Sequence, residues 1–87
     1  MIQNLYAIKD TKAGFNPTFI EANDFTAMRS VKRAMSDPKS DINIFAEDYE
    51  LWCVGTYDTE TGILCSKLNH LINLIDLKST SKDESVQ

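Results

Sequence analysis

Apolar residues recur at intervals of three and four in the segment 24–36, which carries the clearest pattern in the chain. The repeat consists of Phe25, Met28, Val31 and Met35. This spacing places the four side chains along one face of a helix. Asn23 or Asp24 can cap its start, and Asp37-Pro38 ends it, because the residue before a proline disfavours helical geometry. We therefore predict one amphipathic helix over 24–36.

Two short segments before this helix favour extended structure. Residues 5–8 are mostly apolar and end at Lys9-Asp10, which predicts a first strand. Residues 18–20 are β-prone and lead directly into the helix, as an edge strand or as an extended lead-in. Glycine, asparagine and proline lie between these two segments, and we expect a loop over 11–17.

Residues 49–57 carry many aromatic and β-branched side chains, which predict a strand. The polar turn 58–62 contains Gly62, which can adopt a positive φ, and residues 63–66 are again β-prone. We therefore predict a hairpin of two antiparallel strands. Strict alternation divides the strand 49–57 into two faces. Trp52, Val54 and Thr56 lie on one face, and Leu51, Cys53, Gly55 and Tyr57 lie on the other.

Two further segments have mixed patterns. Residues 39–48 combine polar turn formers with apolar positions, and we expect a loop anchored by its apolar side chains. The run 68–77 has helical spacing, which predicts a C-terminal helix, and it also fits a strand. Its periodic apolar positions are Leu68, Leu71, Ile72 and Ile75. From Lys78 onward the chain is polar, as is typical of a flexible tail.

These elements predict a single α+β domain over residues 1–77 and a polar flexible tail over 78–87. The expected fold is a small antiparallel sheet of three to four strands with one packed helix and a C-terminal helix. Hydrophobic residues make up 43% and charged residues 25% of the chain, as in an ordinary globular protein. No run approaches the roughly 18 apolar residues of a membrane span, and the first residues lack a signal-peptide pattern. We expect the protein to stay in the cell that makes it.

The net charge of −4 is unevenly distributed. Residues 1–39 hold six basic and four acidic groups, whereas residues 40–66 hold six acidic groups and no Lys or Arg. A dipolar chain of this kind suits charge-complementary contact with a partner or with a second copy better than uniform coating of nucleic acid.

The candidate chemistry argues against a metal centre and against an enzyme. Cys53 and Cys65 lack the second cysteine pair or histidine cluster of a zinc site, so we expect two small buried side chains, possible neighbours across the hairpin. His70 has no nucleophile motif beside it. An acidic group without calcium-loop spacing predicts a solvated edge, and it comprises Glu47, Asp48, Glu50, Asp58 and Glu60. We expect no catalytic residue, no metal and no cofactor.

Three basic residues, Arg29, Lys32 and Arg33, lie at spacings of three and four on the predicted helix, and Lys12 or Lys39 can extend this patch. Such a face attracts the phosphates of nucleic acid. The aromatic side chains that can stack on unpaired bases, if exposed, are Tyr6, Tyr49, Trp52 and Tyr57. The same pattern is also typical of a solvated helix face with aromatic side chains in the core, and both interpretations stay open.

Four blocks of the sequence, taken in order, resemble a known family. They are Leu5 to Ala13, Phe15 to Asp24 running into Ala27-Met28-Arg29, Ser36-Asp37-Pro38, and Ala46 to Asp58 followed by Thr61-Gly62. The combination resembles the small nonstructural protein of gokushovirus-type microviruses, which are phages with circular single-stranded DNA genomes. The likeness spans residues 4–66 and does not extend from Lys67 onward.

This resemblance implies a protein that is absent from the virion and linked to DNA binding or to the control of single-stranded DNA synthesis. It supplies no catalytic or binding residues. We therefore expect a phage accessory protein of the host cytoplasm, active in genome replication or packaging, that binds single-stranded DNA or phage or host replication proteins. The alternative is a protein–protein adaptor or homo-oligomeric module without DNA binding, which the net charge of −4 favours. Neither function involves a membrane.

Overall fold

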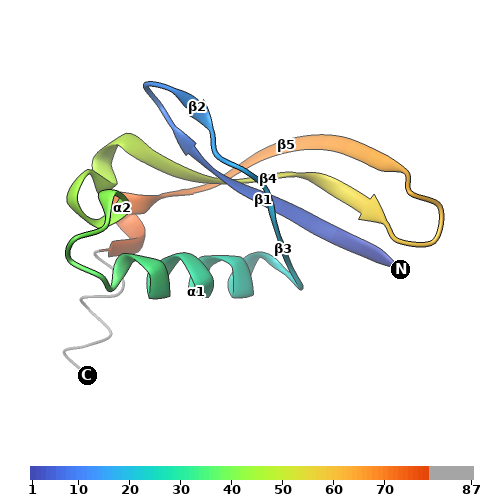
Figure 1. Ribbon diagram of the computed structural model, residues 1–87, viewed down its shortest axis with the longest axis horizontal. Coiled ribbons are helices and arrows are strands. Elements are labelled where there is room, and N and C mark those ends of the chain that lie inside the picture. The colour runs from blue at the N-terminus through green and yellow to red at the C-terminus, as the bar shows by residue number, and fades with distance from the viewer. Residues whose placement is uncertain (79–87) are drawn as a thin grey trace.

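The computed structural model describes residues 1–78 and has one antiparallel sheet with a helix packed across one face (Figure 1). The sheet contains, within these residues, the strands β1 (Ile2–Asp10), β2 (Gly14–Phe15), β3 (Phe19–Glu21), β4 (Tyr49–Asp58) and β5 (Leu64–Asn73). The helical elements are α1 (Asp24–Met35), α2 (Asp41–Ile44), the 3₁₀ turn η1 (Ala46–Asp48) and a last turn over 74–78. The predicted α+β class is confirmed, with five strands where three to four were expected.

β1 joins the two parts of the sheet. Along one edge it pairs antiparallel with β2 and β3, and along the other edge it pairs with β4. β5 pairs with β4 and forms the far edge. Of the two options for residues 18–20, the structure has the edge strand. β1, β4 and β5 are all longer than the apolar runs that predict them, because backbone pairing continues past those runs.

The core lies between α1 and the face of the sheet that carries Tyr6 and Leu51, both of which are fully buried. The buried cluster consists of Tyr6, Ala27, Val31, Met35, Ala46, Leu51, Leu74 and Leu77. The side chains of α1 form the middle of this cluster, and those of the last helical turn lie at one end of it. No helix among residues 1–78 is long and apolar enough to cross a membrane.

α1 begins and ends close to the predicted positions, and its buried face includes Met28, Val31 and Met35 of the predicted stripe but not Phe25. Asn23 caps the first turn by accepting a hydrogen bond from the Thr26 N–H at 3.0 Å, and the Thr26 hydroxyl accepts from the Asn23 N–H at 3.1 Å. Phe25 is 79% exposed, so its predicted place in the buried stripe is wrong. Ala27 is buried instead. Two residues correspond to about 200° around a helix, so the two side chains point in nearly opposite directions.

The predicted loop over 39–48 is wrong, because this segment is largely helical. Ser40 caps α2 by accepting from the Asn43 N–H, and the Asn43 side-chain amide donates to the Met35 carbonyl at 2.7 Å. Ala46 is its buried anchor, whereas Ile44 and Phe45 remain exposed. The capping hydrogen bonds therefore order a segment whose apolar spacing alone carries no helical pattern.

The predicted C-terminal helix is wrong over residues 68–73, where β5 continues, and correct from Leu74 onward. The strand alternative therefore describes the first part of this run. Leu74 and Leu77 fill the core, and the Lys78 ammonium donates to the Asn43 carbonyl at 3.0 Å. Beyond Lys78, the predicted flexible tail lies outside the described residues.

Candidate nucleic-acid interface

α1 leaves one face of the sheet uncovered, and β1 shows which side chains lie there. Tyr6 and Ile8 pack into the core beneath α1, so alternation places Ala7 and Lys9 on the opposite side of the sheet. We call this opposite side the open face. Residues directly paired across strands share a face, so the register extends the assignment to every strand.

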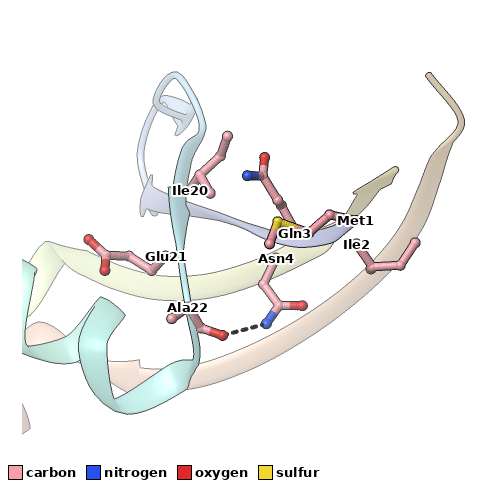
Figure 2. A pocket seen from close by; sticks show the side chains of 7 residues that line it. All are labelled: Met1, Ile2, Gln3, Asn4, Ile20, Glu21 and Ala22. Carbon is pink, nitrogen blue, oxygen red and sulfur yellow. Dashed lines mark hydrogen bonds between the residues drawn. The ribbon is translucent and has the colours of Figure 1, made fainter. Parts of the chain in front are cut away.

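Four rows of paired residues cross the open face. They are Phe15, Lys9, Glu50 and Asn73; Ala7, Trp52 and His70; Ile20, Leu5, Gly55 and Ser66; and Gln3, Tyr57 and Leu64. Figure 2 shows Gln3 and Ile20 on one side of β1 and Asn4 on the other, as this assignment requires. Phe15, Trp52, Tyr57 and His70 therefore lie on the side of the sheet that α1 does not cover, whereas Tyr6, Phe19 and Tyr49 pack on the α1 side.

The predicted division of β4 into two faces holds only as far as Cys53. A register shift separates Tyr6 and Cys53 from Leu5 and Gly55, with Val54 as the additional residue of β4. Such a bulge reverses the alternation that follows it. Tyr57 therefore lies on the same face as Trp52, and its predicted place beside Leu51 is wrong.

Lys9, Phe15, Trp52 and His70 form a continuous group on the open face, which we call the aromatic cluster. The Phe15 and His70 rings meet the Trp52 ring edge to face, with centroids 5.7 and 5.5 Å away. The Lys9 ammonium lies 5.5 Å from the Phe15 centroid and 5.4 Å from the Trp52 centroid. Phe15 is 47% exposed, Trp52 is half-buried and His70 is exposed, so solvent reaches all three rings.

Short-range structure fixes each member of the aromatic cluster. A tight turn returns the chain so that β2 pairs Phe15 with Lys9, and Gly14 takes a φ of 119° there. The Trp52 indole N–H donates to the Glu50 carboxylate at 2.9 Å. The His70 Nε2 lies 2.8 Å from the Asn73 side-chain oxygen. These contacts restrain the rings.

The aromatic cluster is suited to stacking more than to electrostatic attraction. Exposed rings on a sheet can stack on unpaired bases, and each stacked base contributes about 1–3 kcal/mol. Lys9 supplies a positive charge beside the rings, while Glu50 supplies a nearby negative charge. The chemistry of this surface therefore suits a flat ring better than it suits general attraction for phosphates.

A family model described as Phage ORF5 protein matches residues 3–77. The chain belongs to this family. The matched span includes α1, the leucines of the last turn and the described strands except the first residue of β1, so it covers the whole buried cluster. No curated protein and no solved structure matches the chain. The family match identifies the chain as a phage protein.

The structure places the predicted basic residues of α1 in this phage protein on the opposite side of the sheet from the aromatic cluster. Arg29 and Arg33 are exposed and Lys32 is half-buried on α1, which packs against the other face of the sheet. Lys39 is exposed in the turn that follows α1. Lys12, in the turn after β1, lies 3.5 Å from the Asp48 carboxylate. The basic helix patch and the aromatic cluster are thus two separate surfaces.

Of the aromatic residues predicted to stack on bases, Tyr6 is fully buried, and Trp52 lies in the aromatic cluster. The sequence pattern did not predict Lys9, Phe15 or His70 as residues of a binding site. β2 is too short to carry a periodic pattern, and the helical interpretation of 68–77 concealed the strand that pairs His70 with Trp52. The strand alternative for 68–77 was the available signal.

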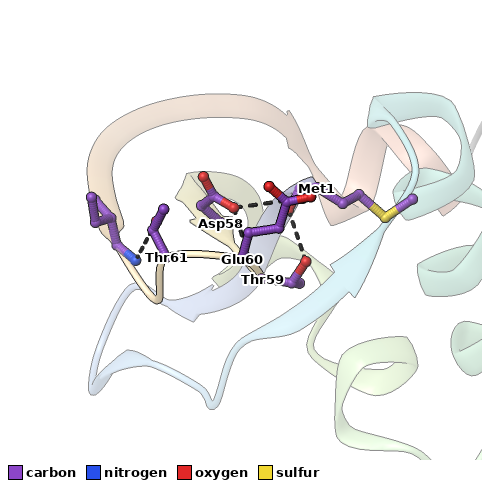
Figure 3. Close-up of polar contacts among 6 residues, drawn as sticks. Met1, Asp58, Thr59, Glu60 and Thr61 are labelled. Carbon is purple, nitrogen blue, oxygen red and sulfur yellow. Dashed lines mark hydrogen bonds and ion pairs between the residues drawn. The ribbon is translucent and has the colours of Figure 1, made fainter.

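The acidic residues do not gather in one place. Asp58 and Glu60 form the hairpin tip, where the Met1 amino group lies 3.5 and 3.6 Å from their carboxylates (Figure 3). The Glu60 backbone N–H, which donates to Asp58, holds the pKa of that carboxyl below its usual range. Within residues 1–78, no three His, Cys, Asp or Glu side chains are arranged to hold a metal ion.

The two cysteines are free and separated in register. Cys53 pairs with Asn69, while Cys65 pairs with Thr56. Cys65 is exposed, so its expected burial is wrong, because this part of β5 extends past α1. The cysteines therefore do not form a neighbouring pair across the hairpin.

Proposed function

We propose that the protein is an accessory factor of a gokushovirus-type microvirus that binds single-stranded DNA during genome replication or packaging in the host cytoplasm. The aromatic cluster on the open face is the observation that carries this proposal. Family membership supports the phage setting, and the chemistry of the open face supports the ligand. The proposed activity is binding, without catalysis.

Single-stranded DNA fits the aromatic cluster better than a duplex does. Bases in a duplex are stacked on one another, so their faces are not available to protein rings. An unpaired base can lie against Trp52 or Phe15, with the Lys9 ammonium close enough to reach its phosphate. Because the rings recognise the face that every base possesses, we expect weak sequence preference.

Intrinsic fluorescence provides the first test, because Trp52 is the only tryptophan. Titration with an unlabelled oligothymidylate at low salt should quench the emission in a saturable manner, since thymine stacked on indole quenches it. A duplex of equal length serves as the control. Equal or absent responses to the two DNAs, from folded protein, would reject the proposal.

Matched variants separate the two surfaces. Phe15→Ala combined with His70→Ala should weaken binding by about tenfold or more, since each lost stacking contact contributes about 1–3 kcal/mol. Phe25→Ala removes an exposed ring on α1 and should leave binding unchanged. Arg29→Ala combined with Arg33→Ala tests the helix patch, whose loss should reduce the salt dependence of binding if phosphates contact it.

A second candidate function, a protein–protein adaptor or homodimeric module without DNA binding, is favoured by the exposed apolar residues. An open pocket of about 460 Å³ lies between the start of β1 and the end of β3, and Ile2 and Ile20 are among the residues that line it. Large exposed apolar surfaces commonly mark protein contacts. A folded protein that binds no DNA at low salt would leave this function as the better account.

A further inference from the structure

The far edge of the sheet has features of an interface. β5 pairs only with β4 within the described chain, whereas the opposite edge of the sheet is covered by β2 and β3. All residues over 64–70 are exposed. Figure 1 shows the β4–β5 hairpin extending past the start of α1, so among the described residues the outer edge of β5 has no neighbouring strand here and no helix covers it.

Open strand edges are usually protected by charges, proline, short length or bulges. The segment 64–70 contains no proline, and Lys67 is its only charged residue. Register shifts occur in the β4–β5 pairing, yet the faces alternate regularly along this segment. Pairing places Leu64 and Ser66 on the open face and Asn69 on the α1 side. Seven residues of strand are therefore available to pair, with one register shift, at Lys67 and Leu68, among them.

The apolar residues of this segment are placed so that they can pair with the same residues in a second copy of the chain. Leu64 is 68% exposed and Leu68 is 61% exposed, and alternation places both on the open face. Two antiparallel β5 strands related by a two-fold axis form an isologous contact, which closes and needs no other partner. The chain carries −4 overall, but this edge contributes only one charge per copy, so repulsion between copies is small here.

Two requirements determine the register in which the two β5 strands pair: opposite residues must share a face, and like charges must not lie opposite each other. In an antiparallel pair opposite residues share a face, so the two-fold axis passes through a residue. An axis at Lys67 would place two ammonium groups directly opposite each other, which is destabilising. An axis at Ser66 pairs Leu64 with Leu68 of the second copy, and the reverse, giving two leucine pairs. An axis at Leu68 gives only one.

We propose that two copies of the chain pair antiparallel through β5, with the two-fold axis at Ser66, and form one continuous sheet. The dimer does not depend on DNA binding. Because the axis is perpendicular to the sheet, the open faces of both copies lie on the same side. If the proposed function is correct, the dimer presents two aromatic clusters to one strand and lengthens the binding site.

Sedimentation without DNA tests the dimer separately from the proposed function. The wild-type chain should sediment as a dimer at tens of micromolar, and Leu64→Asp combined with Leu68→Asp should convert it to a monomer. Phe25→Asp places the same charge on an exposed site of α1 and should leave the dimer intact. A wild-type monomer at this concentration, or an equally dimeric double variant, would overturn the proposal.

Cysteine cross-linking tests the register. In a Cys65→Ser background, Ser66→Cys should form an intermolecular disulfide under mild oxidation, because directly opposite Cβ atoms lie within about 5.5 Å and need little movement to bond. Leu68→Cys should not, since its two copies would lie about 14 Å apart along the strands. Cross-linking of both variants to equal extent, or of neither, would reject the axis at Ser66.

Discussion

Gly55 occupies the position at which β4 changes register against both of its neighbours. Its φ is 155°, and a Cβ atom built there would lie 2.1 Å from the Cys65 carbonyl oxygen. Backbone atoms of β5 cannot move away from such a collision without losing their pairing with β4. The residue therefore permits both the bulge and the close approach of the two strands.

We expect Gly55→Ala to lower the free energy of unfolding by more than 2 kcal/mol, roughly the combined cost of an unfavourable φ and a forced backbone shift. Gly62→Ala is the matched control, because Gly62 also has a positive φ but open space around it. Its cost should be about 1 kcal/mol. Urea unfolding of both variants measures the difference, and equal costs would show that the contact with Cys65 carries no weight.

Tyr6 links two elements, because its hydroxyl donates to the Asp24 carboxylate in the first turn of α1 at 2.9 Å. Burial, together with this hydrogen bond, raises the pKa of Tyr6 well above its ordinary value of 10. The neutral hydroxyl is favoured in the folded state. Its contribution to stability is therefore fully present below pH 10 and is lost as the pH rises beyond that value.

We expect Tyr6→Phe to cost about 1–3 kcal/mol at pH 7, because it removes a hydrogen bond to a charged group. The variant should also lose less stability than the wild type between pH 9 and 11, since it has no buried phenol to ionise. Chemical denaturation at the two pH values gives both quantities. A parallel decline of wild type and variant would contradict the link between β1 and α1.

Element by element, sequence reasoning succeeds where one local pattern dominates. α1 has a periodic stripe, a cap and a proline stop, and β4 has a dense β-prone run, so both are predicted within a residue or two. The tertiary setting decides the rest. Leu71 and Ile72 fit either structure, and pairing with β4 determines that they form a strand. The aromatic cluster could not be predicted, because Phe15 and His70 are far apart in the sequence and are brought together by their contacts with Trp52.

At the scale of the whole molecule, the two ends of the described chain contribute to one core. Tyr6 near the start and Leu77 near the end are both in the buried cluster with the side chains of α1. The last helical turn therefore holds β5 in place at one end, while the other end of β5 stays uncovered. The stability of the open face then depends on leucines that are buried on the other side of the sheet.

Leu77→Ala tests this dependence. Leu77 is 3% exposed, and its truncation should lower the free energy of unfolding by about 2–5 kcal/mol, a large part of the stability of so small a domain. Ile75→Ala is the matched control, because Ile75 belongs to the same turn but is 42% exposed. We expect its cost to stay below about 0.5–1 kcal/mol.

The unfolding transition distinguishes a global from a local role for this turn. If the leucines of the last turn complete the single core, Trp52 fluorescence and far-ultraviolet circular dichroism should shift together in Leu77→Ala, to the same lower denaturant midpoint. If the turn merely fastens the end of β5, Trp52 should report an earlier transition than the helical signal does. We expect coincident transitions, since Leu77 contacts the cluster that Tyr6 and α1 share.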